Sequence, residues 1–417
     1  MVKDTNSIQK KSTAGRNSRL VVFIKILGFA GILAYFCASF YLYAMQASVD
    51  GVTNVQYFES DLPAHISMAF DGWGYSLTAV VYRLLGFFPG WKYTIPLFLA
   101  LCTAGATLLT YFGLKSVLKN DVRAIGGALI TSFAMPIHVA AIQAQRYIGY
   151  QSGSIWHNST YNVMKILSVA TLILYLKLAS EMNEKFKTKE LVWFAVMLAL
   201  TTAAKTSFTL VFAPAAFILL IVDKTQKVSW KKVFSMAATV VPAILVMLLQ
   251  EVILFGDSTG NGIEIDFGYT VYRRAAYPQI TMILSALFPV LVFLFNIIPV
   301  ARETVKSLGR REGLKHRAFW LSWIMWFIGA LQLLFLKETG ERADAGNFAW
   351  GYDLCLFVLF VVSLGYFIRN LRNDKFLFGS RVCRVIYGIV LGAVLLAHTY
   401  CGLYFFMCLL EGTTYFM

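Results

Sequence analysis

The stretch LVVFIKILGFAGILAYFCASFYLYAM (residues 20–45) decides the fold class. It contains one charged residue, Lys25, in a run longer than the roughly 20 apolar residues that cross a bilayer as a helix. A cleaved signal peptide has a shorter apolar core and a small-x-small cleavage site, and this stretch has neither feature. We therefore predict a retained first transmembrane helix.

The rest of the chain continues this apolar character. Of its 417 residues, 58% are hydrophobic and 14% are charged, whereas soluble domains carry about 25% charged residues. The sequence predicts an all-α fold, a polytopic transmembrane helical bundle of about 11 spans. The predicted spans are 20–45, 92–114, 123–143, 161–180, 190–204, 206–222, 233–254, 279–300, 318–336, 348–368 and 385–409. Whether segments 190–222 and 66–88 fully cross the membrane stays open.

The basic residues indicate how these spans are oriented. Cytoplasmic loops of membrane proteins are enriched in Lys and Arg. One alternating face of the predicted topology holds 27 Lys and Arg residues and the opposite face holds 8. This split predicts a cytoplasmic N-terminus and an extracytoplasmic C-terminus in a cell membrane, with a bacterial plasma membrane as the expected location. It also accounts for the net charge of +15, so membrane lipids are the expected partners and no nucleic acid is expected.

The predicted topology has one domain. Residues 1–19 are expected to form a disordered basic cytoplasmic tail, and residues 20–417 a single transmembrane domain. The extracytoplasmic loops are expected at 46–91, 144–160, 255–278 and 337–347. They are more polar and chemically richer than the cytoplasmic loops, so a functional site is expected on the outer face. The first outer loop mixes apolar residues with isolated charges, which favours one or two helices lying at the interface.

An acidic pair opens that first loop. Glu59 and Asp61 are two residues apart and could share a proton or a divalent metal such as Mg²⁺ or Mn²⁺. A carboxylate in an apolar lining can also act as a general base. The simpler interpretation is a solvated acidic loop, because this spacing is common by chance.

Further charged and aromatic residues fall in the outer loops. Lys205 lies between two short apolar segments, where a cation and the start of the following helix can hold an anion. Ser159 or Thr160 is expected to cap the fourth span. Ordinary belt aromatics, snorkelling lysines and neutralised acids remain the structural alternatives. The remaining candidates for binding an acceptor or a sugar are His65, Asp71, Trp156, His157, Asn158, Glu341, Arg342 and Asn347.

The Glu59-Ser60-Asp61 motif after a first helix with a cytoplasmic N-terminus resembles the C-type integral membrane glycosyltransferase superfamily. The resemblance covers mainly the first 120 residues and the overall topology. It implies a sugar transferred from a polyprenyl-phosphate donor to a glycan, lipid or protein acceptor at the extracytoplasmic face. Asp61 would then be the general base, with Glu59 supporting it or holding a metal. The donor phosphate would be bound by basic residues, for which the candidates are Lys205, Arg146, Arg273 and Arg274.

Two other functions stay open. Polysaccharide polymerases and ligases that use lipid-pyrophosphate-linked glycans also have about ten to twelve spans, but they concentrate their chemistry in one or two large loops. A lipid or solute transporter would show internal repeats and charges near the bilayer midplane. Here the charges gather at the outer ends of the spans, which favours the glycosyltransferase.

Overall fold

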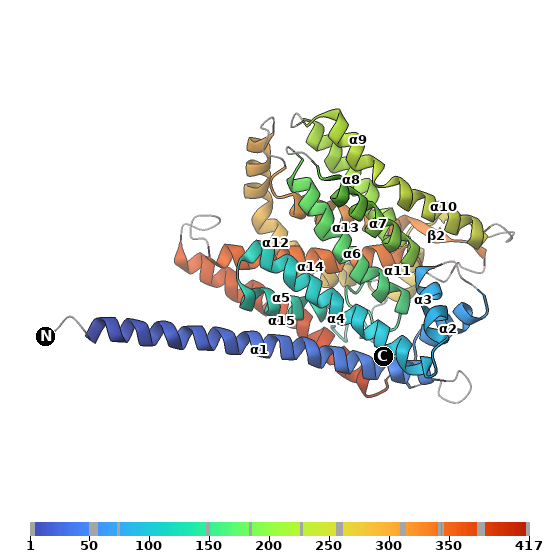
Figure 1. Cartoon of the computed structure of the whole chain (residues 1–417), viewed down its shortest axis with the longest axis horizontal. Coiled ribbons are helices and arrows are strands. Elements are labelled where there is room, and N and C mark those ends of the chain that lie inside the picture. The colour runs from blue at the N-terminus through green and yellow to red at the C-terminus, as the bar shows by residue number, and fades with distance from the viewer. Residues whose placement is uncertain are drawn as a thin grey trace.

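The computed structural model describes residues 5–49, 57–72, 76–146, 151–182, 186–225, 228–255, 262–308, 314–340, 343, 346–372 and 380–413. These residues form a helical bundle with one two-stranded ribbon, so the predicted all-α fold is confirmed (Figure 1). The elements are α1 (Thr5–Ser48), α2 (Leu62–Phe70), α3 (Leu77–Gly86), α4 (Trp91–Leu118), α5 (Asp121–Ser132), α6 (Ser159–Ser180), α7 (Thr188–Ala204), α8 (Ser207–Thr225), α9 (Trp230–Ala238), α10 (Val241–Phe255), β1 (Ile263–Ile265), α11 (Tyr269–Arg274), α12 (Pro278–Ser307), α13 (Arg317–Phe335), β2 (Leu336–Glu338), α14 (Ala349–Arg372) and α15 (Arg381–Leu410).

Nine segments of the described chain are long and apolar enough to cross a membrane, which makes the protein polytopic. They are Arg19–Ser48, Trp91–Leu118, Ser159–Ser180, Ser207–Thr225, Trp230–Ile253, Pro278–Ser307, Arg317–Phe335, Ala349–Arg372 and Arg381–Leu410. The predicted number of eleven is not confirmed. The two segments that fall short are α5, with 12 residues, and α7, with 17 residues.

The predicted span 123–143 is wrong as a continuous helix. Helix α5 ends at Ser132 because Pro136 has no N–H to bond the Ser132 carbonyl and disfavours a helical Met135. The freed Ser132 carbonyl instead accepts a hydrogen bond from Ser154 Oγ at 2.8 Å. The chain continues without regular structure, and the Met135 N–H donates to the His398 carbonyl of α15 at 3.3 Å.

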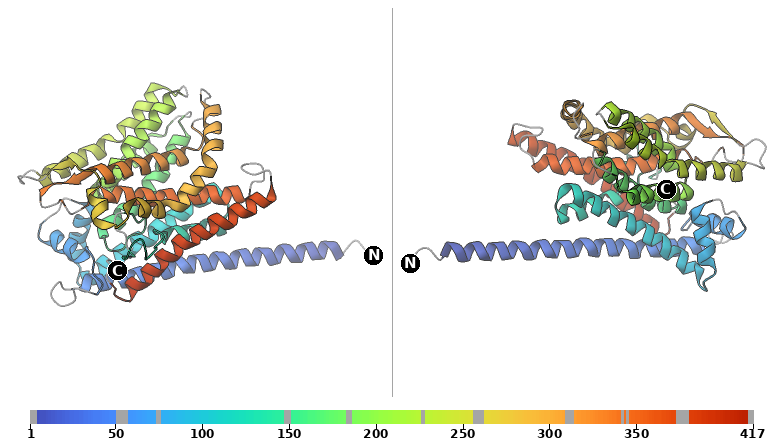
Figure 2. Two further views of the ribbon diagram at one scale, coloured as in Figure 1. Left: turned by 180° about the vertical axis from the view of Figure 1, so that it is seen from behind. Right: turned by 45° about the horizontal axis from the view of Figure 1, so that its top comes forward.

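Helix α1 runs along one side of the bundle and extends beyond it toward the N-terminus (Figures 1 and 2). It begins at Thr5, inside the segment predicted to be a tail, and its side chains are described from Arg19 onward. The disorder and the cytoplasmic side of residues 1–19 stay predictions. Helices α2 and α3 lie at the opposite end of the molecule from the N-terminus. They have 9 and 10 residues, too few to cross about 30 Å of hydrocarbon.

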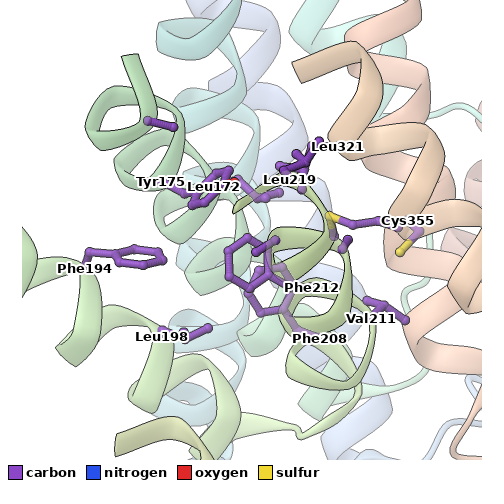
Figure 3. Packing of buried hydrophobic residues seen from close by; sticks show 14 of the residues in the cluster. Leu172, Tyr175, Phe194, Leu198, Phe208, Val211, Phe212, Leu219, Leu321 and Cys355 are labelled. Carbon is purple, nitrogen blue, oxygen red and sulfur yellow. The ribbon is translucent and has the colours of Figure 1, made fainter. Parts of the chain in front are cut away.

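The core gathers around α14, which is buried on nearly all sides. Its largest cluster joins α14 to α6, α7, α8 and α13, and Figure 3 shows Phe208 and Phe212 of α8 at its centre. Two glycines permit the close packing. A Cβ on Gly351 would lie 2.9 Å from the Ser207 carbonyl oxygen, and one on Gly329 would lie 3.0 Å from Tyr352 Cα. Helix α14 therefore packs backbone to backbone against α8 and α13.

A buried ion pair joins α8 to α13 at the end of α8 farther from α2 and α3. Arg317 donates through both terminal nitrogens to the two carboxylate oxygens of Asp223, with 2.9 Å between Nη1 and Oδ2. Asp223 is fully buried and Arg317 is 7% exposed. Because neither charge reaches solvent, each needs the other, and the pair locks these helices together.

Candidate functional site

Asp61 is held at the start of α2 by two contacts from the segment before α6. Its backbone N–H donates to the His157 carbonyl at 3.0 Å, and its Oδ2 accepts a hydrogen bond from Asn158 Nδ2 at 2.8 Å. Pro63 lies in the first turn of α2, where its fixed φ suits the start of a helix. Within the described part of the chain no hydrogen bond reaches Asp61 Oδ1. Asn158 thus fixes one carboxylate oxygen, and the other accepts no hydrogen bond from the described residues.

Asn158 orients this carboxylate because its own side chain is fixed at both ends. Its Oδ1 accepts from the Tyr161 N–H at 2.9 Å and from Thr160 Oγ1 at 2.8 Å. The side-chain amide nitrogen must therefore face Asp61. Asn158 is the N-cap of α6, so the prediction of Ser159 or Thr160 as the cap is wrong. Asn158 therefore caps α6 with its side-chain oxygen and holds Asp61, at the start of α2, with its side-chain nitrogen.

Lys205 reaches the same group from another helix. It follows the last residue of α7, and its Nζ donates to Thr160 Oγ1 at 3.0 Å. The ammonium also lies 4.9 Å from the centre of the Trp350 ring, at the start of α14. Asp61 and Lys205 are therefore linked through the side chains of Asn158 and Thr160. The structure thus brings the acidic side chain of Asp61 and the basic side chain of Lys205, far apart in the sequence, to one end of the bundle.

Two histidines complete the group. The Nδ1 atom of His65 is 2.9 Å from Ser159 Oγ, and the His157 ring centre is 5.9 Å from that of Trp350. The pKa of each imidazole is lowered to about 4, mainly by burial, with Asp61 opposing this shift and Lys205 adding to it. Both side chains are therefore neutral near pH 7. They can donate or accept a hydrogen bond without competing with Lys205 for an anion.

Glu59 lies beside Asp61 in the same loop. Burial, together with the Asp61 charge, raises its pKa above the usual range. This pair offers at most two carboxylates. Among the described residues no group of three or more His, Cys, Asp or Glu side chains is arranged to hold a metal ion. We therefore derive no step through a metal, and the predicted Mg²⁺ or Mn²⁺ stays a prediction.

Two predicted binding residues lie away from this group. Trp156 is 2% exposed, donates through Nε1 to Tyr35 Oη at 2.9 Å and packs on Phe406. The ring is therefore a core side chain, and its predicted role in binding an acceptor or sugar stays a prediction. Asp71 ends α2, at the other end of that helix from Asp61, and accepts from Ser67 Oγ at 2.9 Å.

The predicted arginines contact other elements. Arg146 lies 4.6 Å from the Tyr404 ring centre of α15, and Arg273 packs on Tyr269 within α11. Arg274 ends α11. Phosphate binding by these three side chains together with Lys205 stays a prediction. Glu341 and Arg342 lie outside the described residues.

The loops predicted at 255–278 and 337–347 pair with each other. Strands β1 and β2 are antiparallel, with Glu264 opposite Lys337. The Lys337 ammonium lies 2.5 Å from Glu264 and 3.0 Å from Asp266, and these acids raise its pKa. Beyond β2, Asn347 accepts a hydrogen bond through its carbonyl from Ser207 Oγ at 3.2 Å. Asn347 is thus joined to the first residue of α8, two positions after Lys205.

Two features of the site were missed from the sequence. Trp350 joins Lys205 and His157, but a tryptophan at the start of a span is also what an ordinary aromatic belt provides. The other is an apolar groove of about 460 Å³ between α7 and α10. It is lined by Val192, Ala195, Val196, Ala199, Leu200, Ala203, Pro242 and Val246. Small residues at every fourth position of α7 leave this space, and the same helix ends at Lys205.

The fold and the site define a polytopic helical membrane protein with a charged, partly buried site at one end. No protein-family model matches the sequence, and a search of curated proteins found no match.

Proposed function

We propose that the protein is a membrane glycosyltransferase that moves a sugar from a polyprenyl-phosphate donor to a hydroxyl of a glycan, lipid or protein acceptor at the extracytoplasmic face. The observation that carries the proposal is the linkage of Asp61 to Lys205 through Asn158 and Thr160. It provides a fixed carboxylate for a proton and an ammonium for a phosphate within one group of side chains.

The reaction follows from these positions. Asp61 accepts the proton of the acceptor hydroxyl as the acceptor oxygen bonds to the anomeric carbon of the donor. The bond from that carbon to the phosphate oxygen breaks, and its electron pair leaves with the phosphate. Lys205 stabilises the charge that develops on this leaving group. Direct displacement of this kind inverts the configuration at the anomeric carbon.

The apolar groove supports a donor with a long hydrocarbon chain. It follows α7 and is lined only by apolar side chains, so an isoprenoid tail can lie in it at the depth of the membrane. Helix α7 then ends at Lys205, where a phosphate at the head of the same lipid is attracted to the ammonium. A lipid-linked donor needs these two features on one element.

The test is thermal stabilisation of the purified protein by undecaprenyl monophosphate, with undecaprenol as the uncharged comparison. We expect the phosphate to raise the melting temperature of the wild type, and Lys205→Met to remove most of this shift. Lys92→Met is the matched control, because Lys92 also lies over a tryptophan ring, 5.8 Å from the centre of Trp91. Equal shifts for the two variants would contradict the assignment of Lys205.

Transfer itself is assayed with radiolabelled hexoses on undecaprenyl monophosphate and with undecaprenyl-pyrophosphate oligosaccharides. We expect release of free undecaprenyl phosphate from the first donor. Activity with the second donor alone would replace the proposal with a polymerase or ligase. Solute uptake into proteoliposomes without sugar transfer would replace it with a transporter.

A further inference from the structure

The segment Gln151–Asn158 lies inside the bundle although none of its residues is helical. All eight residues are buried. In a membrane protein such a backbone persists only where other parts of the protein satisfy its hydrogen bonds. The segment ends in His157 and Asn158, the two residues that hold Asp61. The contacts that hold this segment in place therefore also hold the Asp61 carboxylate in place.

Two ionisable side chains bind the dipeptide Ser152–Gly153 at its two ends. Asp353 of α14 accepts through Oδ1 from the Ser152 N–H at 3.1 Å. Lys165 of α6 donates through Nζ to the Gly153 carbonyl at 3.1 Å, and Tyr161 Oη donates to the same carbonyl at 3.1 Å. A carboxyl side chain thus binds the N–H, and an amino side chain binds the C=O.

The same two helices close around the dipeptide. The Lys165 ammonium lies 3.8 Å from the ring centre of Phe357, one turn after Asp353 on α14. A Cβ on Gly153 would lie 3.0 Å from the Phe357 nitrogen and 3.1 Å from its Cα, so the dipeptide packs directly on the α14 backbone. A side chain at position 153 would push the segment away from α14.

Ionisable residues inside membrane spans are costly and usually have a specific task. Asp353 is fully buried and Lys165 is 9% exposed, both within spanning helices. The small polar cavity beside Lys165 has room for about one water molecule, too little for a substrate. The task of these two residues is therefore to hold the chain around them.

We propose that Lys165 and Asp353 are positioning residues that clamp Ser152–Gly153 and thereby set the place of Asn158 and Asp61. The proposal rests on the proposed function, since it concerns the same carboxylate. It predicts that loss of either hydrogen-bonding group moves Asp61 relative to the acceptor hydroxyl while donor binding at Lys205 continues. A misplacement of about 1 Å can lower a catalytic rate by about 100-fold.

The experiment compares kcat, the donor KM and the melting shift with undecaprenyl monophosphate for Asp353→Leu, Asp353→Asn and Lys165→Met. We expect Asp353→Leu and Lys165→Met each to lower kcat by about 100-fold, with the donor KM and the melting shift within about threefold of wild type. Asp353→Asn keeps an oxygen for the Ser152 N–H and should restore most of kcat. Because both side chains bind one dipeptide, the double variant should fall less than the product of the two single effects.

Ser363→Ala is the matched control, a buried polar substitution farther along α14 that should leave kcat unchanged. Wild-type kcat in Lys165→Met, or failure of Asp353→Asn to exceed Asp353→Leu, overturns the clamp. If Asp353→Leu does not fold, Lys165→Met and Gly153→Ala decide by the same criteria. Full activity of Asp61→Asn would instead reject the proposed function, whatever the clamp variants do.

Discussion

The protein pairs an acidic with a basic side chain at each end of α8, and the two pairs are built differently. Asp223 and Arg317 bind each other directly in a bidentate pair that neither solvent nor a ligand can enter. Asp61 and Lys205 are linked through neutral side chains, and Asp61 keeps one carboxylate oxygen for another partner. The first arrangement uses charge to join helices. The second keeps charge in place for a ligand, so damage to the two groups should have different consequences.

The largest expected effect on stability comes from breaking the Asp223–Arg317 ion pair. Arg317→Met leaves Asp223 buried with no cation, and we expect a loss of about 3–5 kcal/mol in the free energy of unfolding. Thermal and denaturant unfolding in detergent measures this loss. The exposed Arg273→Met should change stability by less than about 0.5 kcal/mol. A similarly small effect of Arg317→Met would show that the pair is not what joins α8 to α13.

The corresponding loss of a positive charge from the Asp61–Lys205 group should lower activity and leave stability nearly unchanged. Lys205→Met removes the ammonium that we propose stabilises the leaving phosphate, and we expect transfer to fall by about 100-fold or more. The melting temperature without lipid should stay close to that of wild type. Initial rates of undecaprenyl phosphate release measure the effect, and a large loss of stability with normal transfer would reverse the roles of the two groups.

The pH dependence of stability tests whether the histidines beside Asp61 and Lys205 are buried in their neutral form. The pKa of His157 is about 4 in the folded protein and near 6.5 when unfolded, so the unfolded chain binds more protons between these values. Stability is therefore complete above about pH 6.5 and falls as the pH drops toward 4, by up to about 1.4 kcal/mol per pH unit for this residue. Melting curves of wild type and His157→Gln measure it. We expect a shallower slope in the variant, and equal slopes would contradict burial of a neutral imidazole.

A modest effect on stability is expected at Asn158, where capping and orientation can be separated. Asn158→Ala removes the cap of α6 and should cost about 1 kcal/mol. Asn158→Asp keeps the capping oxygen but places a second carboxylate against Asp61. It should therefore retain stability and still lose transfer. If both variants transfer sugar at the wild-type rate, Asn158 is only a cap.

Much of the architecture could be predicted from hydropathy and charge. The apolar runs predict the nine long helices, and the polar residues between them predict Asp61, His157, Asn158 and Lys205 as candidates. The end of α5 was also readable, because Pro136 forbids the hydrogen bond that the predicted span needed.

The position of Gln151–Asn158 was not readable in the same way. Its polar residues are typical of a solvated loop, and only the surrounding helices show that their partners lie inside the bundle. Trp156 is buried for the same reason, because it belongs to this segment. Trp350 and the α7–α10 groove depend on which helices become neighbours, and local sequence does not specify these contacts.

The proposed function depends on Asp61 taking the acceptor proton. The most direct measurement is the single-turnover rate of sugar transfer from an undecaprenyl-monophosphate donor by Asp61→Asn, with Asp71→Asn on the same helix as the control. We predict a 10²- to 10⁴-fold fall for Asp61→Asn, with donor binding retained and Asp71→Asn active as wild type. A wild-type rate in Asp61→Asn, or an equal fall in both variants, would show that Asp61 is not the general base.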